Sequence, residues 1–232
     1  MFEKGEWHYP PVLVIVAALN EEEGIGPTIA DLRRYLGNPW VLVVDGKSCD
    51  GTAEIAREMG AEVICQEGKG KGDAIATAVK HINAGPDYVV FTDADYTYPA
   101  EYLPRMVRLL EEESQVGMVA GNRFNQRLDA RSLHNLLYFG NRLLAFTHNL
   151  FNGVGMSDPL TGLRVVRAEI LRNWKPRSKS FDVEVELNHH VERKGYGIAE
   201  IPIVYRPRLG EKKLKIAHGA TILRRILSEA VY

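Results

Sequence analysis

Two aspartates stand one residue apart at the end of an apolar run. Asp93 and Asp95 follow residues 88–92, a segment typical of a buried strand. Residues two apart on an extended chain point to the same side, so the two carboxylates can converge. Two adjacent carboxylates ionise together only where a cation or several donors compensate their charge. Two interpretations stay open: a turn capped by the aspartates, or a site for a hard divalent ion.

Polar residues also follow the first two predicted strands. Asn20 and Glu21 come after the apolar run 12–18, and Asp45 comes after the run 40–44. Apolar runs alternate with helical patterns here, which predicts βαβ units and a largely parallel sheet. Ligands of such sheets bind in the crevice at the carboxyl ends of the strands. We therefore expect these polar groups to line one edge of the sheet.

The predicted elements follow from the apolar periodicity. Strands are expected at 12–18, 40–44, 61–65, 88–92, 116–121, 163–166 and 198–205. Helices are expected at 28–36, 52–59, 73–81, 99–113, 133–151 and 181–194. The sequence Gly-Ile-Gly-Pro at 24–27 predicts a loop. No repeat or clear linker interrupts the pattern, which favours a single domain over residues 1–232.

The composition narrows the classes of protein. Of the 232 residues, 45% are hydrophobic and 25% are charged, as in ordinary folded proteins. The formal net charge of −1 gives no general attraction to nucleic acid, and we expect no such partner. Cys49 and Cys65 form no zinc pattern, which favours free thiols in a reducing compartment. The first residues are too polar for a signal peptide, and no apolar run is long enough to span a bilayer.

The last part of the sequence combines apolar and basic residues. Apolar side chains recur there at roughly helical spacing, among lysines and arginines: Leu214, Ile216, Ile222, Leu223, Ile226, Leu227 and Val231. A basic amphipathic segment can lie on an anionic membrane, or it can pack as a helix on its own domain. The pattern leaves both interpretations open.

A stretch rich in glycine and lysine, EGKGKGDAIATA at 67–78, precedes a predicted helix. A helix N-terminus of this kind suits an anionic group. The stretch matches neither GxGxxG nor GxxxxGK[ST], so neither standard nucleotide-binding loop is present. A solvated turn is the other interpretation.

Six motifs occur in a fixed order: VAALNEEEGI (16–25), VVDGKSCDGTAEIA (43–56), GKGDAI (70–75), FTDADYTYPAE (91–101), GNRF (121–124) and DPLTGLRVVR (158–167). On these motifs the chain resembles family 2 glycosyltransferases with a GT-A fold. Within that family it is similar to the polyprenyl-phosphate sugar synthases, typified by dolichol-phosphate mannose synthase. The resemblance implies a Rossmann-like α/β fold with a mostly parallel sheet flanked by helices. It further implies a nucleotide-sugar-binding half (about 1–122), an acceptor half (about 123–213) and an amphipathic tail (about 214–232).

The resemblance also implies roles for single residues. The positions that hold the donor are Ala18, Asn20, Glu21, Asp45 and Lys71. Asp93 and Asp95 match the DxD motif, so they are the expected catalytic pair and the ligands of Mg²⁺ or Mn²⁺, through which they would bind the donor diphosphate. The positions that face the acceptor phosphate and the diphosphate are Arg123, Arg142, Arg208 and Lys213.

Some positions depart from the family pattern. Thr97 and Asp182 stand where the mannose-type synthases commonly carry glutamine. The first difference leaves open whether a third side chain reaches the metal. Lys212 replaces a serine in GEKKL, and the second strand is followed by VDGKS rather than DDGS.

The acceptor decides whether a base is needed. A hydroxyl acceptor must lose a proton to a general base, whereas a phosphate monoester, with a second pKa of about 6, is already a nucleophile at pH 7. Basic residues are frequent after Asn122, which favours a phosphate carried on a lipid. The alternative is a saccharide hydroxyl with Asp182 or Glu184 as base. Both acids also fit the N-terminus of a helix, where they complement its dipole.

These observations predict an inverting, metal-dependent glycosyltransferase that moves a sugar from a nucleotide donor to a polyprenyl phosphate. The resemblance implies GDP-mannose as the preferred donor, with UDP-glucose or UDP-N-acetylglucosamine as alternatives. We expect a peripheral protein on the cytoplasmic face of a membrane. A sugar nucleotidyltransferase is the competing enzyme class, but it needs a basic loop near the N-terminus, where VAALNEEEGI is acidic.

Overall fold

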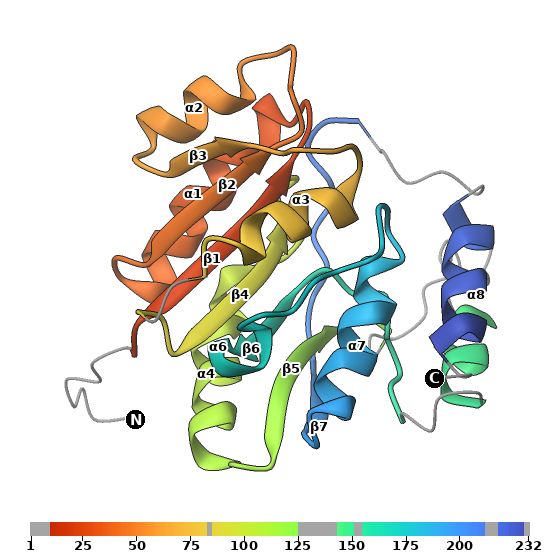
Figure 1. Cartoon of the computed structure of the whole chain (residues 1–232). Coiled ribbons are helices and arrows are strands. Elements are labelled where there is room, and N and C mark those ends of the chain that lie inside the picture. The colour runs from red at the N-terminus through yellow and green to blue at the C-terminus, as the bar shows by residue number, and fades with distance from the viewer. Residues whose placement is uncertain (1–9, 83–84, 125–142, 151–154, 212–217, 230–232) are drawn as a thin grey trace.

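The computed structural model describes residues 10–82, 85–124, 143–150, 155–211 and 218–229 (Figure 1). Within these residues a seven-stranded sheet has the order β3-β2-β1-β4-β6-β5-β7. β6 runs antiparallel to both of its neighbours, and the other pairs are parallel. The strands are β1 (Val12–Ala18), β2 (Trp40–Asp45), β3 (Glu62–Cys65), β4 (Tyr88–Asp93), β5 (Val116–Asn122), β6 (Arg164–Arg167) and β7 (Gly197–Pro202).

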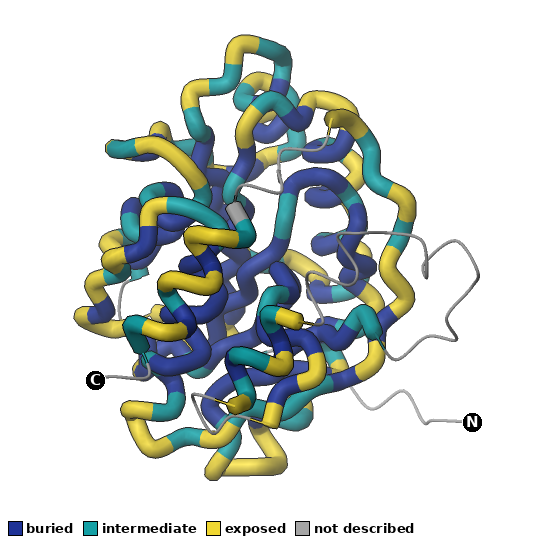
Figure 2. The backbone as a smooth tube through the Cα atoms, turned by 90° about the vertical axis from the view of Figure 1, so that its right-hand side faces the viewer, coloured by how far each residue is buried: buried dark blue, intermediate teal, exposed yellow. Residues whose placement is uncertain are grey.

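Helices cover both faces of the sheet because the central strands are apolar on both sides. In β1, Val14 and Val16 pack toward one core with α1 and α4, whereas Leu13 and Ile15 pack toward a second core with α3 and α7. Figure 2 shows the interior of the molecule as mostly buried chain, in dark blue. The helices are α1 (Glu22–Leu36), α2 (Thr52–Glu58), α3 (Lys71–Val79), α4 (Leu103–Glu112), α6 (Ala168–Leu171), α7 (Val183–Arg193) and α8 (His218–Glu229).

The predicted α/β class and the mostly parallel sheet are confirmed. The predicted loop at 24–27 is wrong, because α1 already begins at Glu22 and includes these residues. Position 24 has no room for a side chain, because a Cβ on Gly24 would lie 2.5 Å from the carbonyl oxygen of Ala94. The glycine therefore marks close packing of α1 on the turn after β4, and not a break in the helix.

Other boundaries differ by less. The predicted helix at 99–113 is a 3₁₀ turn (Ala100–Tyr102) followed by α4, and the last strand ends at Pro202 instead of residue 205. The short helix α6 was not predicted. Of the long helix predicted at 133–151, residues 143–150 are helical and the rest lies outside the described residues.

The C-terminal segment does form a helix that packs on its own chain. In α8, Ile222 and Ile226 are buried against Val185 of α7, while Leu223 and Leu227 are about two-fifths exposed. Leu144, from the helical residues 143–150, packs against the same cluster. Figure 1 shows this short helix beside α8. Among the described helices, none is both long and apolar enough to cross a bilayer.

Substitution of the two glycines of α1 should have opposite effects on stability. Gly24→Ala forces a methyl group against the backbone of Ala94 and Asp95, so we expect the free energy of unfolding to fall by about 1–3 kcal/mol. In Gly26→Ala the new methyl group meets a side-chain carbon at 3.4 Å, and the gain in helix propensity should leave stability equal or up to about 1 kcal/mol higher. Urea unfolding of both variants measures the difference. Equal stabilities would show that α1 does not press on this turn.

Candidate active site

The carboxyl ends of β1, β2 and β4 lie side by side. Ala18 pairs in register with Asp45, and Ala17 pairs with Asp93. The residues that follow these strands therefore emerge at one edge of the sheet, as predicted from the sequence.

The first two loops are bound to each other by side chains. The N–H of Asn20 donates to Ser48 Oγ at 2.9 Å, and its Oδ1 accepts the N–H of Cys49 at 2.9 Å. Asp45 accepts the N–H groups of Lys47 and Ser48 at 3.0 and 3.1 Å and the Ser48 hydroxyl at 2.6 Å. Asn20 and Asp45 thus shape the loops at the predicted donor site, beside Ala18.

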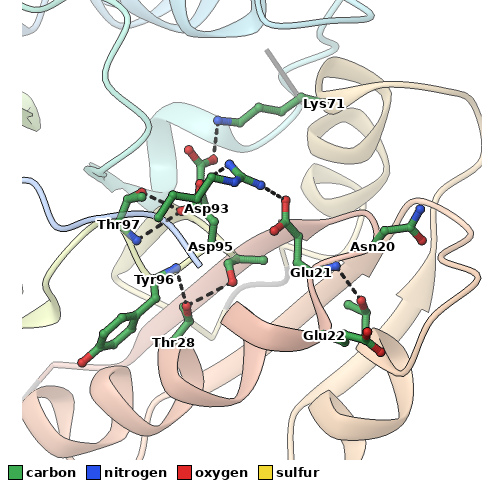
Figure 3. Close-up of polar contacts among 12 residues, drawn as sticks. Asn20, Glu21, Glu22, Thr28, Lys71, Asp93, Asp95, Tyr96 and Thr97 are labelled. Atoms are coloured by element: carbon green, nitrogen blue, oxygen red, sulfur yellow. Dashed lines mark hydrogen bonds and ion pairs between the residues drawn. The ribbon is translucent and has the colours of Figure 1, made fainter. Parts of the chain in front are cut away.

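Asp93 is paired with a lysine that also reaches a second acid. Lys71, the first residue of α3, places its Nζ 2.6 Å from Asp93 Oδ1 (Figure 3). The same Nζ lies 2.7 Å from Glu184 Oε1 of α7. Burial lowers the pKa of Lys71, but the two carboxylates outweigh that effect and the net shift is upward. The lysine is therefore a permanent cation between β4 and α7.

Asp95 also pairs with a basic residue that contacts a second acid, in this case an arginine. Arg208, from the chain after β7, pairs through one nitrogen with Asp95 and through another with Glu21. Thr97 donates its hydroxyl to Asp95 Oδ1 at 2.6 Å and its N–H to the same oxygen at 3.2 Å (Figure 3). Thr97 is buried and serves as a donor to the aspartate, which is a different role from that of a metal-binding side chain.

The two aspartates do not sit on one continuous strand. β4 ends at Asp93, and the chain then turns, with Tyr96 at φ 65°. The turn is packed closely, since a Cβ on Gly162 would lie 2.8 Å from Asp93 Oδ2. In this structure Asp93 pairs with Lys71 and Asp95 pairs with Arg208.

The charges at this edge fit a divalent cation. Four carboxylates, those of Glu21, Asp93, Asp95 and Glu184, face the cations Lys71 and Arg208 and the buried Arg164 near Glu184, which leaves a formal excess of one negative charge. Burial and the neighbouring Asp93 raise the pKa of Asp95, so a further cation would stabilise its ionised form.

Oxygen ligands of this kind suit Mg²⁺ or Mn²⁺. The described residues contain no group of three or more His, Cys, Asp or Glu side chains placed to hold a metal. Asp93 and Asp95 would therefore supply the protein ligands, and water or diphosphate oxygens the others.

The glycines around Lys71 are explained by packing. A Cβ on Gly70 would lie 2.4 Å from the carbonyl oxygen of Lys179, and one on Gly72 would lie 2.1 Å from that of Ser178. Glu186 fixes this loop by accepting the N–H groups of Arg177 and Ser178, each at 2.7 Å. The glycines thus let the start of α3 approach the loop before α7, which brings Lys71 to Glu184.

Arg123 is clamped by an acid that the sequence did not single out. The Nε and one terminal nitrogen of its side chain donate to Asp158, each at 2.7 Å. The backbone N–H of Arg123 also donates to Asp158, at 3.0 Å. Glu200 in turn accepts the N–H groups of Ser157 and Asp158 at 2.7 Å. The remaining terminal nitrogen of Arg123 lies 3.4 Å from the hydroxyl of Tyr98, beside the DxD turn.

Asp158 is the first residue of the motif DPLTGLRVVR, so the sequence motif marked this position as a candidate functional residue. Its pairing with an arginine 35 residues away was not visible in the sequence.

The other predicted residues divide into two groups. Arg142, Lys212 and Lys213 lie outside the described residues. Asp182 pairs with Arg225 of α8 at 3.1 Å. Both candidate bases, Asp182 and Glu184, thus lie at the start of α7 and have basic partners.

Loss of the Asp158 charge should destabilise the fold. Asp158→Asn leaves a largely buried guanidinium without its counter-ion, so we expect the free energy of unfolding to fall by about 3 kcal/mol or more. Replacing Arg123 by Met in the same protein should restore part of that loss, because the uncompensated charge is then gone. Urea unfolding measures both.

The control for this substitution is Glu67→Gln. Glu67 pairs with Lys80 on the surface, and its removal should change stability by no more than about 0.5 kcal/mol. If Asp158→Asn and Glu67→Gln have equal small effects, the Arg123 clamp contributes nothing to the fold.

Comparison with known proteins shows the family of this chain. The sequence model described as "Glycosyl transferase family 2" matches residues 13–174. The chain is 39% identical to a dolichyl-phosphate hexose transferase of Haloferax volcanii, over 96% of this chain and 95% of that protein. It is 31% identical to an undecaprenyl-phosphate mannosyltransferase of Micrococcus luteus, over 88% of this chain and 87% of that protein.

A solved structure shares the fold. Glucosyl-3-phosphoglycerate synthase from Mycobacterium tuberculosis, in complex with Mn²⁺, UDP and glucosyl-3-phosphoglycerate, superposes with a TM-score of 0.75. The alignment covers 100% of this chain and 87% of that chain at 21% identity, which shows a common GT-A architecture. With the match of the family model and the two relatives, the chain belongs to glycosyltransferase family 2 and is a glycosyltransferase.

Proposed function

We propose that this enzyme transfers a hexose from a nucleoside diphosphate donor to a polyprenyl phosphate, with inversion at the anomeric carbon. One observation carries the choice of acceptor: both acids considered as bases for a hydroxyl acceptor already pair with cations. Asp182 pairs with Arg225, and Glu184 pairs with Lys71. An acid held in this way is anchored by its cation and is not directed at the hydroxyl group of an acceptor.

A phosphate acceptor needs no base. Its second pKa is about 6, so near pH 7 it is mostly a dianion that can attack directly. What it requires is positioning by basic groups. We assign that task to Arg123 and Arg208, together with Arg142 and Lys213. The names of the two polyprenyl-phosphate relatives support this choice.

On the donor side, Ala18, Asn20, Glu21 and Asp45 would hold the nucleoside, and Lys71 would contact the diphosphate. Asp93 and Asp95 would hold Mg²⁺ or Mn²⁺, which would neutralise the charge that develops on the leaving diphosphate. The Mn²⁺ and UDP in the related complex support a divalent ion.

GDP-mannose remains our preferred donor, because of the sequence resemblance and the mannosyltransferase relative. UDP-glucose is the first alternative, since related structures hold that nucleotide sugar with Mn²⁺. UDP-N-acetylglucosamine is the second.

An exposed apolar surface supports a lipid acceptor. On the helical residues 143–150, three side chains on one face are about two-thirds exposed: Leu143, Phe146 and Leu150. Leu223 and Leu227 of the neighbouring α8 are also exposed, next to the exposed Arg224. We propose that this apolar surface rests on the cytoplasmic face of a membrane and that the enzyme binds there peripherally.

Replacement of Asp95 should abolish most of the transfer. With Mn²⁺ present, Asp95→Ala should reduce sugar transfer to polyprenyl phosphate by at least about 100-fold, because a metal ligand is lost. Asp87→Ala is the matched control, because this exposed residue directly precedes β4 at the end opposite Asp93, and the variant should retain activity. Mass spectrometry of the lipid product, with the three nucleotide sugars supplied in turn, measures transfer and identifies the donor. If Asp95→Ala retains nearly the activity of the parent, Asp95 is not a required ligand of the metal.

The acceptor is tested in the same assay. A polyprenyl phosphate should accept sugar, whereas the matching polyprenol and soluble saccharides should not. The rate should fall below about pH 6 as the phosphate loses its second charge. Efficient transfer to a saccharide would instead support the hydroxyl-acceptor alternative.

The apolar surface should govern binding to membranes. Phe146→Ser with Leu150→Ser removes two exposed apolar side chains, each worth about 1.5–3 kcal/mol when buried, so binding to anionic vesicles should weaken by at least about tenfold. Trp40→Ser, an exposed aromatic residue at the start of β2, is the control. Vesicle co-sedimentation reports the difference. If the double variant sediments like the parent, this surface does not meet the membrane.

A further inference from the structure

Lys71 forms an ion pair with Asp93, one of the two aspartates that would bind the proposed metal. Its Nζ lies within hydrogen-bonding distance of Asp93 Oδ1, at 2.6 Å. The side chain of Lys71 is only 14% exposed. A divalent ion bound to the same carboxylate would stand a few ångströms from this ammonium group. Two cations at that distance repel strongly in a partly buried site. The metal and Lys71 therefore compete for Asp93.

Lys71 has a second carboxylate to which it can remain bound. Glu184 Oε1 lies 2.7 Å from the same Nζ, and the Glu184 side chain is 7% exposed. Its other oxygen, Oε2, has no hydrogen-bond partner among the described residues. Next to it lies a small pocket with room for about one water molecule (≈ 20 Å³), lined in part by Lys71, Phe91, Gly162 and Arg164. Glu184 thus already contacts Lys71 through Oε1 and has a second oxygen, Oε2, that can accept from the lysine when its contact with Asp93 is lost.

We propose that Lys71 exchanges with the divalent cation at Asp93, and that Glu184 is the positioning residue that holds Lys71 during the exchange. In the loaded site the lysine stays on Glu184 and presents its remaining N–H groups to the donor diphosphate. The inference rests on the proposed function, because it requires a nucleoside diphosphate and a metal that bind together.

The exchange couples the two ligands. Without the diphosphate, metal binding has to weaken the Lys71–Asp93 pair and brings two cations together. With the diphosphate present, its negative charge compensates both. Metal and nucleotide consequently bind with positive coupling, in which each increases the affinity for the other. Glu184 then acts as a counter-ion, and not as a base for the acceptor.

The test measures Mn²⁺ affinity without nucleotide, from the electron paramagnetic resonance signal of free Mn²⁺. Lys71→Met removes the competing cation, so it should bind Mn²⁺ about tenfold more tightly than the parent. Glu184→Gln leaves Lys71 with Asp93 alone, so it should bind Mn²⁺ about tenfold more weakly. The controls are Lys69→Met and Glu67→Gln, exposed residues of the same loop with the same changes of charge, and both should leave the affinity unchanged.

A second measurement titrates GDP and UDP in saturating Mn²⁺ by calorimetry. Lys71→Met should bind the preferred nucleotide at least about tenfold more weakly, because the ammonium that meets the diphosphate is gone. Tighter metal binding together with weaker nucleotide binding is the signature of exchange. A lysine with a merely structural role would weaken both or neither.

Two results would overturn the inference: Lys71→Met with unchanged or weaker Mn²⁺ binding, or Glu184→Gln with parental Mn²⁺ binding. If Lys71→Met fails to fold, the Glu184→Gln result decides alone. Failure of the proposed function is distinguishable. A protein that shows the exchange signature yet transfers no sugar to polyprenyl phosphate would refute that acceptor and leave the exchange standing.

Discussion

The carboxyl edge of the sheet depends on two basic side chains shared among four carboxylates. Lys71 joins Asp93 to Glu184, and Arg208 joins Asp95 to an acid on the first loop. Without these cations the four carboxylates would repel each other in a largely buried part of the structure. The same pairs connect the segments that follow β1, β3 and β4 to α7 and to the chain after β7. The interactions that shape the site therefore also connect its two halves.

Close approach of backbone segments makes those pairs possible. Gly24 allows α1 to press on the turn after β4, and Gly72 allows α3 to meet the loop before α7. Each glycine shortens the distance between elements that carry charged groups. A bulkier residue would push the elements apart, and an ion pair loses its hydrogen bonds within about 1 Å of separation. The glycine-rich sequences near the site are thus a requirement of packing.

The helix α7 links the proposed active site to the apolar surface. Glu184 reaches Lys71, whereas the next residue, Val185, is buried with Ile222 and Ile226 of α8. Consecutive residues on a helix point in directions about 100° apart, so one short helix serves both contacts. The helix α7 therefore connects the helix α8, which carries part of the proposed membrane-binding surface, to the charged residues of the proposed donor site.

The sequence by itself determined the α/β class, most strand positions and the polar groups at three strand ends. Each of these follows from local periodicity and from the rule that parallel strands share a carboxyl edge. The loop predicted around Gly24 failed because local composition does not show which backbone lies against a glycine.

Only the tertiary structure decided which charge meets which. Arg208 lies 113 residues from Asp95 in the sequence, and Asp158 lies 35 from Arg123. Such pairs depend on where the strands place their ends, and no local pattern encodes them. For the same reason Glu184, which the sequence offered as a base or as a helix-dipole charge, became the counter-ion of Lys71 once α3 and α7 were brought together.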